Sequence, residues 1–335
     1  MSKHIAVLPC DGAGKEVVPE AIKVLRAAGA DFEFEEFDVN ADAYLRTGVA
    51  IPNDVWSQLE KADAILFGSV GDPRVNDSDY LAGVLLRLRF ELDLYVNLRP
   101  FKAGPSALNT GVDCVVVREN TEGVYAGEGG FLRKGTPNEV ATQGSVNTRL
   151  GVERCVRFAF DLARSREPAA GAPRHVTLVH KTNVLTFAGD LWQRTFDDVA
   201  SEYGDVSTGY QHVDAACIHL VQDPGRYDVI VTDNLFGDIL TDLAGAVSGG
   251  IGRAASANLN PARTGPSVFE PVHGSAPDIA GTGQADPRAA IISVAMLLEF
   301  LGETEAAARV EKAVAASDDA KGTTSEIGDA IAGKV

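Results

Sequence analysis

The sequence lacks the long hydrophobic runs that membrane proteins and secreted precursors need. Its longest apolar stretch, Ala289 to Leu298, is interrupted by Ser293, and it is far shorter than the ~20 residues of a membrane-spanning helix. The first residues, Met1 to His4, lead into a short predicted strand rather than into the apolar core of a secretion signal. These absences predict a cytoplasmic protein that has no membrane partner.

Cysteine is also scarce, and no pair of cysteines has the spacing of a metal-binding or redox motif. The four cysteines are Cys10, Cys114, Cys155 and Cys217. In a cytosolic protein such isolated thiols are usually reduced and buried. The sequence therefore predicts neither a disulfide framework nor a cysteine-ligated metal.

Positive charge is in deficit. The 30 lysines and arginines oppose 47 aspartates and glutamates, which gives a formal net charge of −17 at pH 7. Nucleic acids and anionic membranes bind to basic surfaces, so neither is an expected partner. The same charge repels an anionic substrate, which would therefore need a local arginine cluster or a bound metal ion.

Strand-like and helix-like segments alternate along the chain, which predicts an α/β fold with a mostly parallel sheet. The strand Ile5–Leu8 precedes a helix from about Lys15 to Ala28, and a second helix is predicted over Leu81–Leu92. The polar, glycine-rich stretch from Gly127 to Asn147 is expected to form hairpins or an arm, and the small residues of Glu167 to Pro173 a linker. The 335 residues exceed the roughly 250–300 of a single core, so we expect two domains.

The fingerprint of a dinucleotide-binding Rossmann fold is incomplete. The segment Asp11 to Gly14 follows a strand and opens a helix, but Val17 occupies the place of the third glycine. No acidic residue is clearly placed after a second strand to bind a ribose. A second glycine-rich segment, Phe269–Gly281, offers backbone N–H groups, a histidine and a carboxylate. Alone it would be only a loop.

Two aspartates are spaced for one face of a helix. The apolar strand Val229–Val231 is followed by a turn and then by a helical pattern that contains Asp238 and Asp242. Their like charges cost a few tenths of a kcal/mol at this spacing. Mg²⁺ would offset that cost, since it is typically held by one or two carboxylates with substrate and water oxygens. An exposed acidic helix start, favoured by the helix dipole, explains the spacing equally well.

The order of these segments resembles the β-decarboxylating dehydrogenases, the family of 3-isopropylmalate, isocitrate, homoisocitrate and tartrate/D-malate dehydrogenases. The matching segments cover nearly the whole chain, in the order Asp11-Gly12, Leu85–Pro100, Arg118–Tyr125, His180–Leu185, Asn234–Asp242 and Phe269–Gly281. The resemblance implies a two-domain isopropylmalate/isocitrate dehydrogenase-like α/β fold that is not a Rossmann fold. Residues 1–94 and 248–335 would form a cofactor-binding domain, and residues 95–247 a domain for dimerisation, metal and substrate. The active site would lie in the cleft between the domains of a homodimer whose interface includes the arm.

The resemblance also implies a chemistry. Family members oxidise a 2-hydroxy acid with NAD⁺ and then release the carboxylate on C3 as CO₂. Asp238 and Asp242 would bind Mg²⁺ or Mn²⁺ together with Asp214 of the partner subunit, which would also contact the substrate. The metal would polarise the substrate hydroxyl and later stabilise the enolate.

Five further positions match residues that act on the substrate. Arg89, Arg99 and Arg118 match a clamp for the substrate carboxylates, a task that suits the planar, permanently charged guanidinium group. They supply the local positive charge that the composition as a whole lacks. The resemblance implies that Lys181, reaching across the dimer, takes the hydroxyl proton. Tyr125 would protonate the enol carbon after CO₂ leaves.

The implied cofactor is NAD. Its contacts would come from His273, Gly274, Ser275, Ala276, Asp278, Ile279 and Asp286. Asp278 favours NAD over NADP, because a carboxylate suits the free ribose hydroxyls and repels a 2′-phosphate. No acid–base role is expected of His273.

Family members differ in the group at C3 of a shared malate core. Leu85, Leu86 and, from the partner subunit, Val184 match an apolar pocket for an isopropyl group, whose burial stabilises binding by about 2 kcal/mol. The expected reaction is therefore the oxidative decarboxylation of (2R,3S)-3-isopropylmalate to 2-oxo-4-methylpentanoate and CO₂, in leucine biosynthesis. A tartrate/D-malate enzyme shares the two leucines, and the usual glycine loop is altered at Cys10 and Lys15. A dehydrogenase for another 3-substituted malate therefore stays an alternative.

Two functions of other classes remain as alternatives to a dehydrogenase. A non-catalytic regulatory subunit of the same family would lack the metal aspartates or the lysine, and both are present here. A Mg²⁺-dependent phosphohydrolase would use the pair Asp238 and Asp242, but no phosphate loop or aspartyl nucleophile motif accompanies it. The sequence therefore favours the dehydrogenase.

Overall fold

The computed structural model describes residues 2–29, 31–75, 78–166 and 174–335. The chain forms two compact units. The first unit contains Met1–Leu94, Gly104–Ser106 and Gly249–Val335, and the second contains Tyr95–Ala103 and Ala107–Ser248. The linker predicted at Glu167 to Pro173 lies outside the described residues.

The first unit contains a mixed, mainly parallel set of five strands. Their order is β2 (Phe32–Glu36), β1 (Lys3–Cys10), β3 (Ala64–Ser69), β12 (Ser267–Pro271) and β11 (Ala255–Leu259). All neighbouring pairs are parallel except β11 and β12. Every residue of β3, β11 and β12 is buried, as in sheets that are covered on both faces.

Helices cover both faces of these strands. The helices of this unit include α1 (Gly14–Ala27), α2 (Ala41–Thr47), α3 (Asn53–Leu59), α10 (Arg288–Phe300), α11 (Thr304–Ala315) and α12 (Thr324–Ala332). On one face α1 packs against α10 and α12. On the other face α3 contributes Trp56 and Leu59 to a buried cluster with Leu8 and Ile65 of the strands.

The helix predicted over Leu81–Leu92 is confirmed, but its middle turn is π-helical rather than α-helical. The structure has α4 (Ser78–Leu81), a π-helical turn at Ala82–Leu86 and α5 (Arg87–Glu91). The Arg87 N–H reaches back five residues to the Ala82 carbonyl. Gly83 lies so close to Ala50 that an added Cβ would be 2.7 Å from the Ala50 Cβ. Helical periodicity does not distinguish a π turn from regular helix, nor does it reveal this contact with a distant segment.

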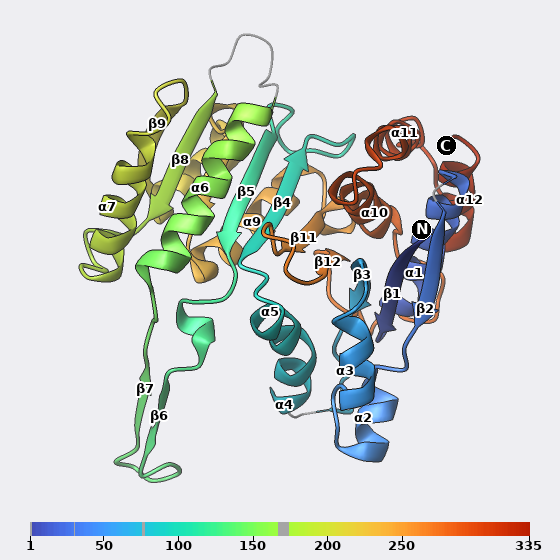
Figure 1. Ribbon diagram of the computed structural model, residues 1–335, viewed down its shortest axis with the longest axis horizontal. Helices are drawn as coiled ribbons and strands as arrows, with labels where there is room; N and C mark the ends of the chain where they lie inside the picture. Colours follow the sequence, from blue (N-terminus) through green and yellow to red (C-terminus); the bar gives the residue numbers. More distant parts are fainter. Residues whose placement is uncertain (1, 30, 76–77, 167–173) are drawn as a thin grey trace. The chain divides into compact units, whose positions relative to one another are not determined.

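The second unit is also a mainly parallel α/β assembly. Its strands follow the order β4 (Val96–Lys102), β5 (Asp113–Glu119), β10 (Val229–Thr232), β8 (His175–His180) and β9 (Ser207–His212). Only β4 and β5 are antiparallel. Its helices include α6 (Arg149–Ser165), α7 (Ala188–Ala200), α8 (Val213–Gln222) and α9 (Asn234–Ser248). Figure 1 shows α6 in front of these strands and α9 behind them.

The predicted arm is a two-stranded antiparallel ribbon. It consists of β6 (Gly129–Leu132) and β7 (Val140–Gln143), which extend away from the other strands of the second unit (Figure 1). All eight residues of the two strands are exposed, Phe131 and Leu132 among them. Among the described residues, no helix has the length and apolar character needed to cross a membrane. The α/β fold with mostly parallel strands is confirmed.

Candidate active site

The two predicted metal ligands lie on the first turns of α9. Strand β10 ends at Thr232, and the Asp233 carboxylate then caps the helix by accepting a 2.8 Å hydrogen bond from the Phe236 N–H. Asp238 and Asp242 follow, one turn apart. Burial, and then the charge of Asp238, raise the pKa of Asp242. A bound cation would relieve both effects, so these carboxylates fit a divalent metal.

Arg118 projects from β5 onto the start of α9. Its side chain is 1% exposed, and its Nη1 lies 2.5 Å from Asp238 Oδ1. The helix offers Gly237 at the point of contact, where a Cβ would lie 2.7 Å from the Arg118 Cβ. A glycine at this position therefore allows the arginine stem to lie against the helix backbone.

Tyr125 and Arg99 converge on the same carboxylate. The Tyr125 hydroxyl donates to Asp238 Oδ2 at 2.9 Å, and the Arg118 guanidinium lies over its ring at 5.4 Å. The buried Arg99 of β4 donates to Thr241 Oγ1 at 2.5 Å, and its Nη1 lies 3.8 Å from Asp238 Oδ1. Asp238 is thus the centre of a cluster that brings it together with three other predicted site residues.

Lys181 and Asp214 form a second, more exposed part. Lys181 follows β8, Asp214 lies in the first turn of α8, and the Lys181 Nζ donates to Asp214 Oδ1 at 2.6 Å. This hydrogen bond lowers the pKa of Asp214. Nearby in the chain, Val184 is 64% exposed. Within the described parts of one chain, no three acidic, histidine or cysteine side chains are grouped to hold a metal, so Asp214 does not join Asp238 and Asp242 there.

The two glycine-rich loops of the first unit meet each other. The Ala13 N–H donates to the Ser275 carbonyl at 2.8 Å. Glu16 at the start of α1 accepts hydrogen bonds from the Gly281 and Gly283 N–H groups at 2.5 and 2.8 Å. Sequence reasoning missed this link because it joins positions about 265 residues apart. The loop from Val272 to Gly283 is therefore held against the start of α1.

The predicted cofactor residues lie on this loop or shortly after it. Among the described residues, the buried His273 Nε2 has no hydrogen-bond partner, which leaves a polar atom for a ligand. Gly274 and Asp278 are exposed, whereas Ser275, Ala276 and Ile279 are partly buried. Asp286 accepts from the N–H and from Nη1 of the buried Arg288, at 3.0 and 2.9 Å. An exposed carboxylate, an orphaned imidazole nitrogen and accessible backbone fit a dinucleotide.

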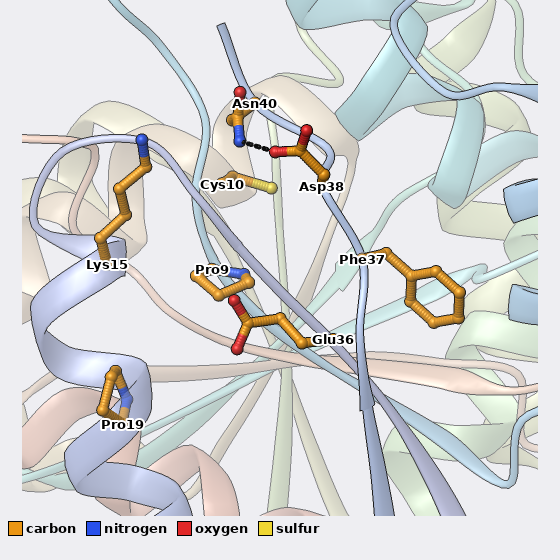
Figure 2. A pocket seen from close by; sticks show the side chains of 8 residues that line it. All are labelled: Pro9, Cys10, Lys15, Pro19, Glu36, Phe37, Asp38 and Asn40. Atoms are coloured by element: carbon orange, nitrogen blue, oxygen red, sulfur yellow. Dashed lines mark hydrogen bonds between the residues drawn. The ribbon is translucent and has the colours of Figure 1, made fainter. Parts of the chain in front are cut away.

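A pocket of about 400 Å³ opens at the carboxyl ends of β1 and β2 (Figure 2). Eight side chains line it, among them Cys10, Lys15, Glu36 and Asp38. Asp38 accepts a hydrogen bond from Asn40, whose side chain caps α2. Cys10 has a left-handed backbone with φ 56°, and burial raises the pKa of its thiol. Two of the positions that depart from the family loop thus face one pocket.

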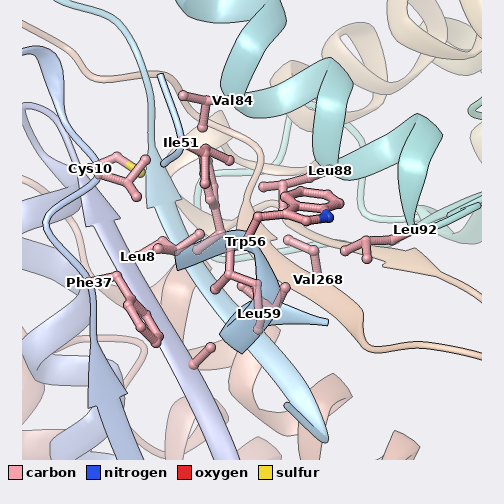
Figure 3. Close-up of a cluster of buried hydrophobic side chains, with 14 of the residues drawn as sticks. Leu8, Cys10, Phe37, Ile51, Trp56, Leu59, Val84, Leu88, Leu92 and Val268 are labelled. Atoms are coloured by element: carbon pink, nitrogen blue, oxygen red, sulfur yellow. The ribbon is translucent and has the colours of Figure 1, made fainter. Parts of the chain in front are cut away.

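The helical segment that carries the remaining site residues packs on the core of the first unit. Val84 and Leu88 enter the buried cluster around Trp56 (Figure 3), and Leu85 lies at its edge. Leu86 is partly buried. Arg89 is buried, and its Nη2 lies 3.7 Å from Glu270 Oε1 on β12.

Glu270 was not singled out from the sequence. It also accepts a 2.7 Å hydrogen bond from Asn258 Nδ2. No local pattern could have identified it, since its partner Arg89 lies 181 residues away by number (270 − 89). The first unit thus positions Arg89 through a buried carboxylate.

The chain was compared with known proteins. It matches the family model described as isocitrate/isopropylmalate dehydrogenase over residues 4–333. It is 56% identical over 339 residues to the 3-isopropylmalate dehydrogenase of Nocardia farcinica (strain IFM 10152), with 99% of each chain covered. It is also 56% identical over 337 residues to the enzyme of that name from Mycobacterium tuberculosis (strain ATCC 25618 / H37Rv), with 98% of each covered.

Solved structures agree with this likeness. The isocitrate dehydrogenase from Methylococcus capsulatus is similar with a TM-score of 0.91 and 35% identity, over 99% of both chains. A β-decarboxylating dehydrogenase from Thermococcus kodakarensis, in its apo form, is similar with a TM-score of 0.81 and 38% identity. That match covers 99% of this chain and 96% of the other.

Proposed function

This chain belongs to the isocitrate/isopropylmalate dehydrogenase family, and from that premise we propose that it converts (2R,3S)-3-isopropylmalate into 2-oxo-4-methylpentanoate and CO₂. The reaction is a step of leucine biosynthesis, and NAD⁺ would accept the hydride. The observation that carries the proposal is the 56% identity, over 99% of the chain, to a 3-isopropylmalate dehydrogenase. The coarser statement, a decarboxylating dehydrogenase that acts on a small molecule, follows from the family itself.

Three arginines would hold the substrate. Arg99 and Arg118 carry permanent positive charge into a buried environment beside Asp238. Arg89, with Glu270 as its neighbour, would contact a carboxylate in the same way. They would overcome the repulsion that a protein of net charge −17 exerts on an anionic substrate.

Two side chains would move protons. Lys181, reaching across the dimer and oriented by Asp214, would take the proton from the C2 hydroxyl in its neutral amine form. Tyr125, oriented by Asp238, would give its hydroxyl proton to C3 after CO₂ departs. Bound Mg²⁺ or Mn²⁺, held by Asp238, Asp242 and Asp214 of the partner subunit, would supply Lewis-acid polarisation of the C2 oxygen.

Substrate choice would depend on apolar contacts. Leu85 and Leu86 offer hydrocarbon from the helical segment of the first unit, which suits an isopropyl group and disfavours a third carboxylate. Val184 is largely exposed in the single chain, so it would meet the substrate of a partner subunit. A D-malate or tartrate enzyme is the alternative, because it would share the leucines.

We also propose a homodimer. Large apolar side chains are exposed on α8 and α9, where Ile218 and Ile239 are about half exposed. Phe187, at the start of α7, is 91% exposed. Contiguous exposed apolar surface marks protein interfaces, and a second copy would cover it. We further place the protein in the cytoplasm, because all four cysteines are free and three of them are buried.

The test is a comparison of substrates. NAD⁺ reduction is followed with Mg²⁺ and 3-isopropylmalate, D-malate, tartrate, isocitrate or homoisocitrate, each with and without EDTA. We expect turnover of 3-isopropylmalate that EDTA abolishes, and little turnover with NADP⁺ because of Asp278. Preference for D-malate or tartrate would overturn the substrate assignment.

A further inference from the structure

Asn234, the first residue of α9, forms side-chain hydrogen bonds beside the cluster around Asp238. It is 1% exposed. Its Oδ1 accepts hydrogen bonds from Arg118 Nε at 3.0 Å and from Nη2 at 2.8 Å. Its Nδ2 donates to the Glu122 carbonyl at 3.1 Å. The amide thus uses an acceptor and a donor on the two sides of one planar group.

The acceptor side of this amide sets the direction of Arg118. Two of the three guanidinium nitrogens are bound to Asn234, and the third, Nη1, lies on Asp238. The stem of the arginine lies against Gly237, where an added Cβ would be 2.7 Å from the Arg118 Cβ. Rotation of the guanidinium group is therefore opposed by Asn234 at one edge and by Asp238 at the other.

The donor side holds the loop that carries Tyr125. The carbonyl that it binds belongs to Glu122, three residues before the tyrosine. The Glu122 carboxylate in turn accepts from the Thr148 N–H at 2.8 Å, and the Gly123 N–H donates to the Val146 carbonyl at 2.7 Å. Asn234 thus holds the start of this loop, while Asp238, one turn later on α9, receives the Tyr125 hydroxyl.

We propose that Asn234 is a positioning residue that couples the orientation of Arg118 to that of Tyr125. This inference rests on the proposed function, in which Arg118 binds the substrate and Tyr125 delivers a proton. One buried amide then sets both substrate affinity and proton delivery. A purely structural asparagine would affect stability but neither kinetic quantity.

Double-mutant cycles test the coupling. Alone, Asn234→Ala should lower kcat roughly tenfold and raise KM for the substrate roughly tenfold. In a Tyr125→Phe background the further loss in kcat should be under about twofold, because the residue through which it acts is already gone. In an Arg118→Lys background the further rise in KM should likewise be under about twofold. Equal effects with and without either partner substitution would overturn the coupling.

A matched control distinguishes the specific role of Asn234 from the general effect of removing an asparagine side chain. Asn109 in the same unit also accepts a backbone N–H, from Gly111 at 2.9 Å, and donates to the carbonyls of Val221 and Gln222. Asn109→Ala should leave kcat and KM unchanged. The same kinetic losses in this variant would count against a specific role of Asn234.

A second variant covers the case in which Asn234→Ala does not fold. Asn234→Asp has the same size and keeps the acceptor for Arg118, but it places an oxygen against the Glu122 carbonyl. Its kcat should fall, and this fall should vanish in the Tyr125→Phe background. An equal fall in both backgrounds would refute the inference.

A failure of the proposed function looks different. The unaltered enzyme is assayed first, and if it uses another 3-substituted malate, the cycles are run with that compound. Substrate affinity is also measured without turnover, by calorimetry with Mg²⁺ and no NAD⁺. A crystal structure of Asn234→Asp gives a readout free of any substrate: the Glu122 carbonyl should have moved away, and an unchanged loop would contradict the proposal.

Discussion

Two parts of the second unit differ in how complete they are. Around Asp238, the side chains of Arg118 and Asn234 are each 1% exposed, and Asn234 forms hydrogen bonds at both its oxygen and its nitrogen. The pair Lys181–Asp214 lies at the surface, with side chains 25% and 67% exposed. The first part makes its polar contacts within one chain, whereas the second presents its charges outward beside exposed apolar residues. This difference fits the proposed homodimer, in which two chains would share one site.

Mixing two inactive variants is the strongest test of whether two chains share one site. Lys181→Ala and Asp238→Asn should each lower kcat by about 10³-fold, since general-base and electrostatic groups contribute on that order. If the site is shared, random mixed dimers contain one intact site, so activity should return to about a quarter of that of the unaltered enzyme. Activity after unfolding and refolding the mixture is the measurement. No recovery would mean that both residues act within one chain.

A charge introduced at the proposed interface should separate the two copies of the chain. Ile218→Asp would bury an unpaired carboxylate between copies, so the dimer should dissociate at least tenfold more readily. Activity at low protein concentration should fall in parallel, and it should recover as concentration rises. Sedimentation and dilution assays check this. Leu45→Asp, at an exposed position of the first unit, is the control. A dimer that tolerates Ile218→Asp would place the interface elsewhere.

The buried cluster can be disturbed without touching a polar group. Gly237→Ala places a methyl group against the Arg118 stem, so the arginine must shift. We expect KM for the substrate to rise roughly tenfold and stability to fall by about 1–3 kcal/mol, as for other overpacking substitutions. Gly204→Ala, at a glycine with open space around it, is the control. Unchanged kinetics in Gly237→Ala would show that Arg118 need not lie where it does.

The smallest expected effect concerns Asp242 and pH. Its pKa is raised in the folded chain, so the folded state holds its proton more tightly than the unfolded state does. Stability from this group is present below the unfolded pKa and is lost as pH rises through the folded pKa. Asp242→Asn should therefore raise the Tm of the metal-free protein by a few degrees near neutral pH (about 1 kcal/mol or less). Mg²⁺ should raise the Tm of the unaltered protein but not that of the variant, and an equal shift in both would exclude Asp242 as a ligand.

The fold could be read from the sequence where the evidence is local. Helical spacing correctly predicted helix over the segment that contains Asp238 and Asp242, and an apolar run predicted β10 before it. The roles of these aspartates, like those of Lys181 and Tyr125, stay predictions. They came from a family resemblance, which periodicity alone would not have provided.

The sequence does not predict contacts between residues that lie far apart along the chain. Arg118 and Asn234 are separated by 116 residues, so neither helical spacing nor strand patterns predict their hydrogen bond. The contact between Asp11 and Tyr80 spans 69 residues: the Tyr80 hydroxyl donates to the buried Asp11 carboxylate at 2.7 Å. Burial, together with that carboxylate, raises the pKa of Tyr80. Such contacts follow from tertiary packing, which a single sequence does not display.

The π-helical turn at Ala82–Leu86 has a consequence for how this enzyme can change over evolution. A π turn holds one residue more than an α turn, so loss of a single codon within it would restore regular helix and leave the flanking turns almost in place. The same loss in regular helix would rotate everything that follows by about 100°. The turn is therefore a place where a lineage could shorten this helix and still present Arg89 to the same neighbours.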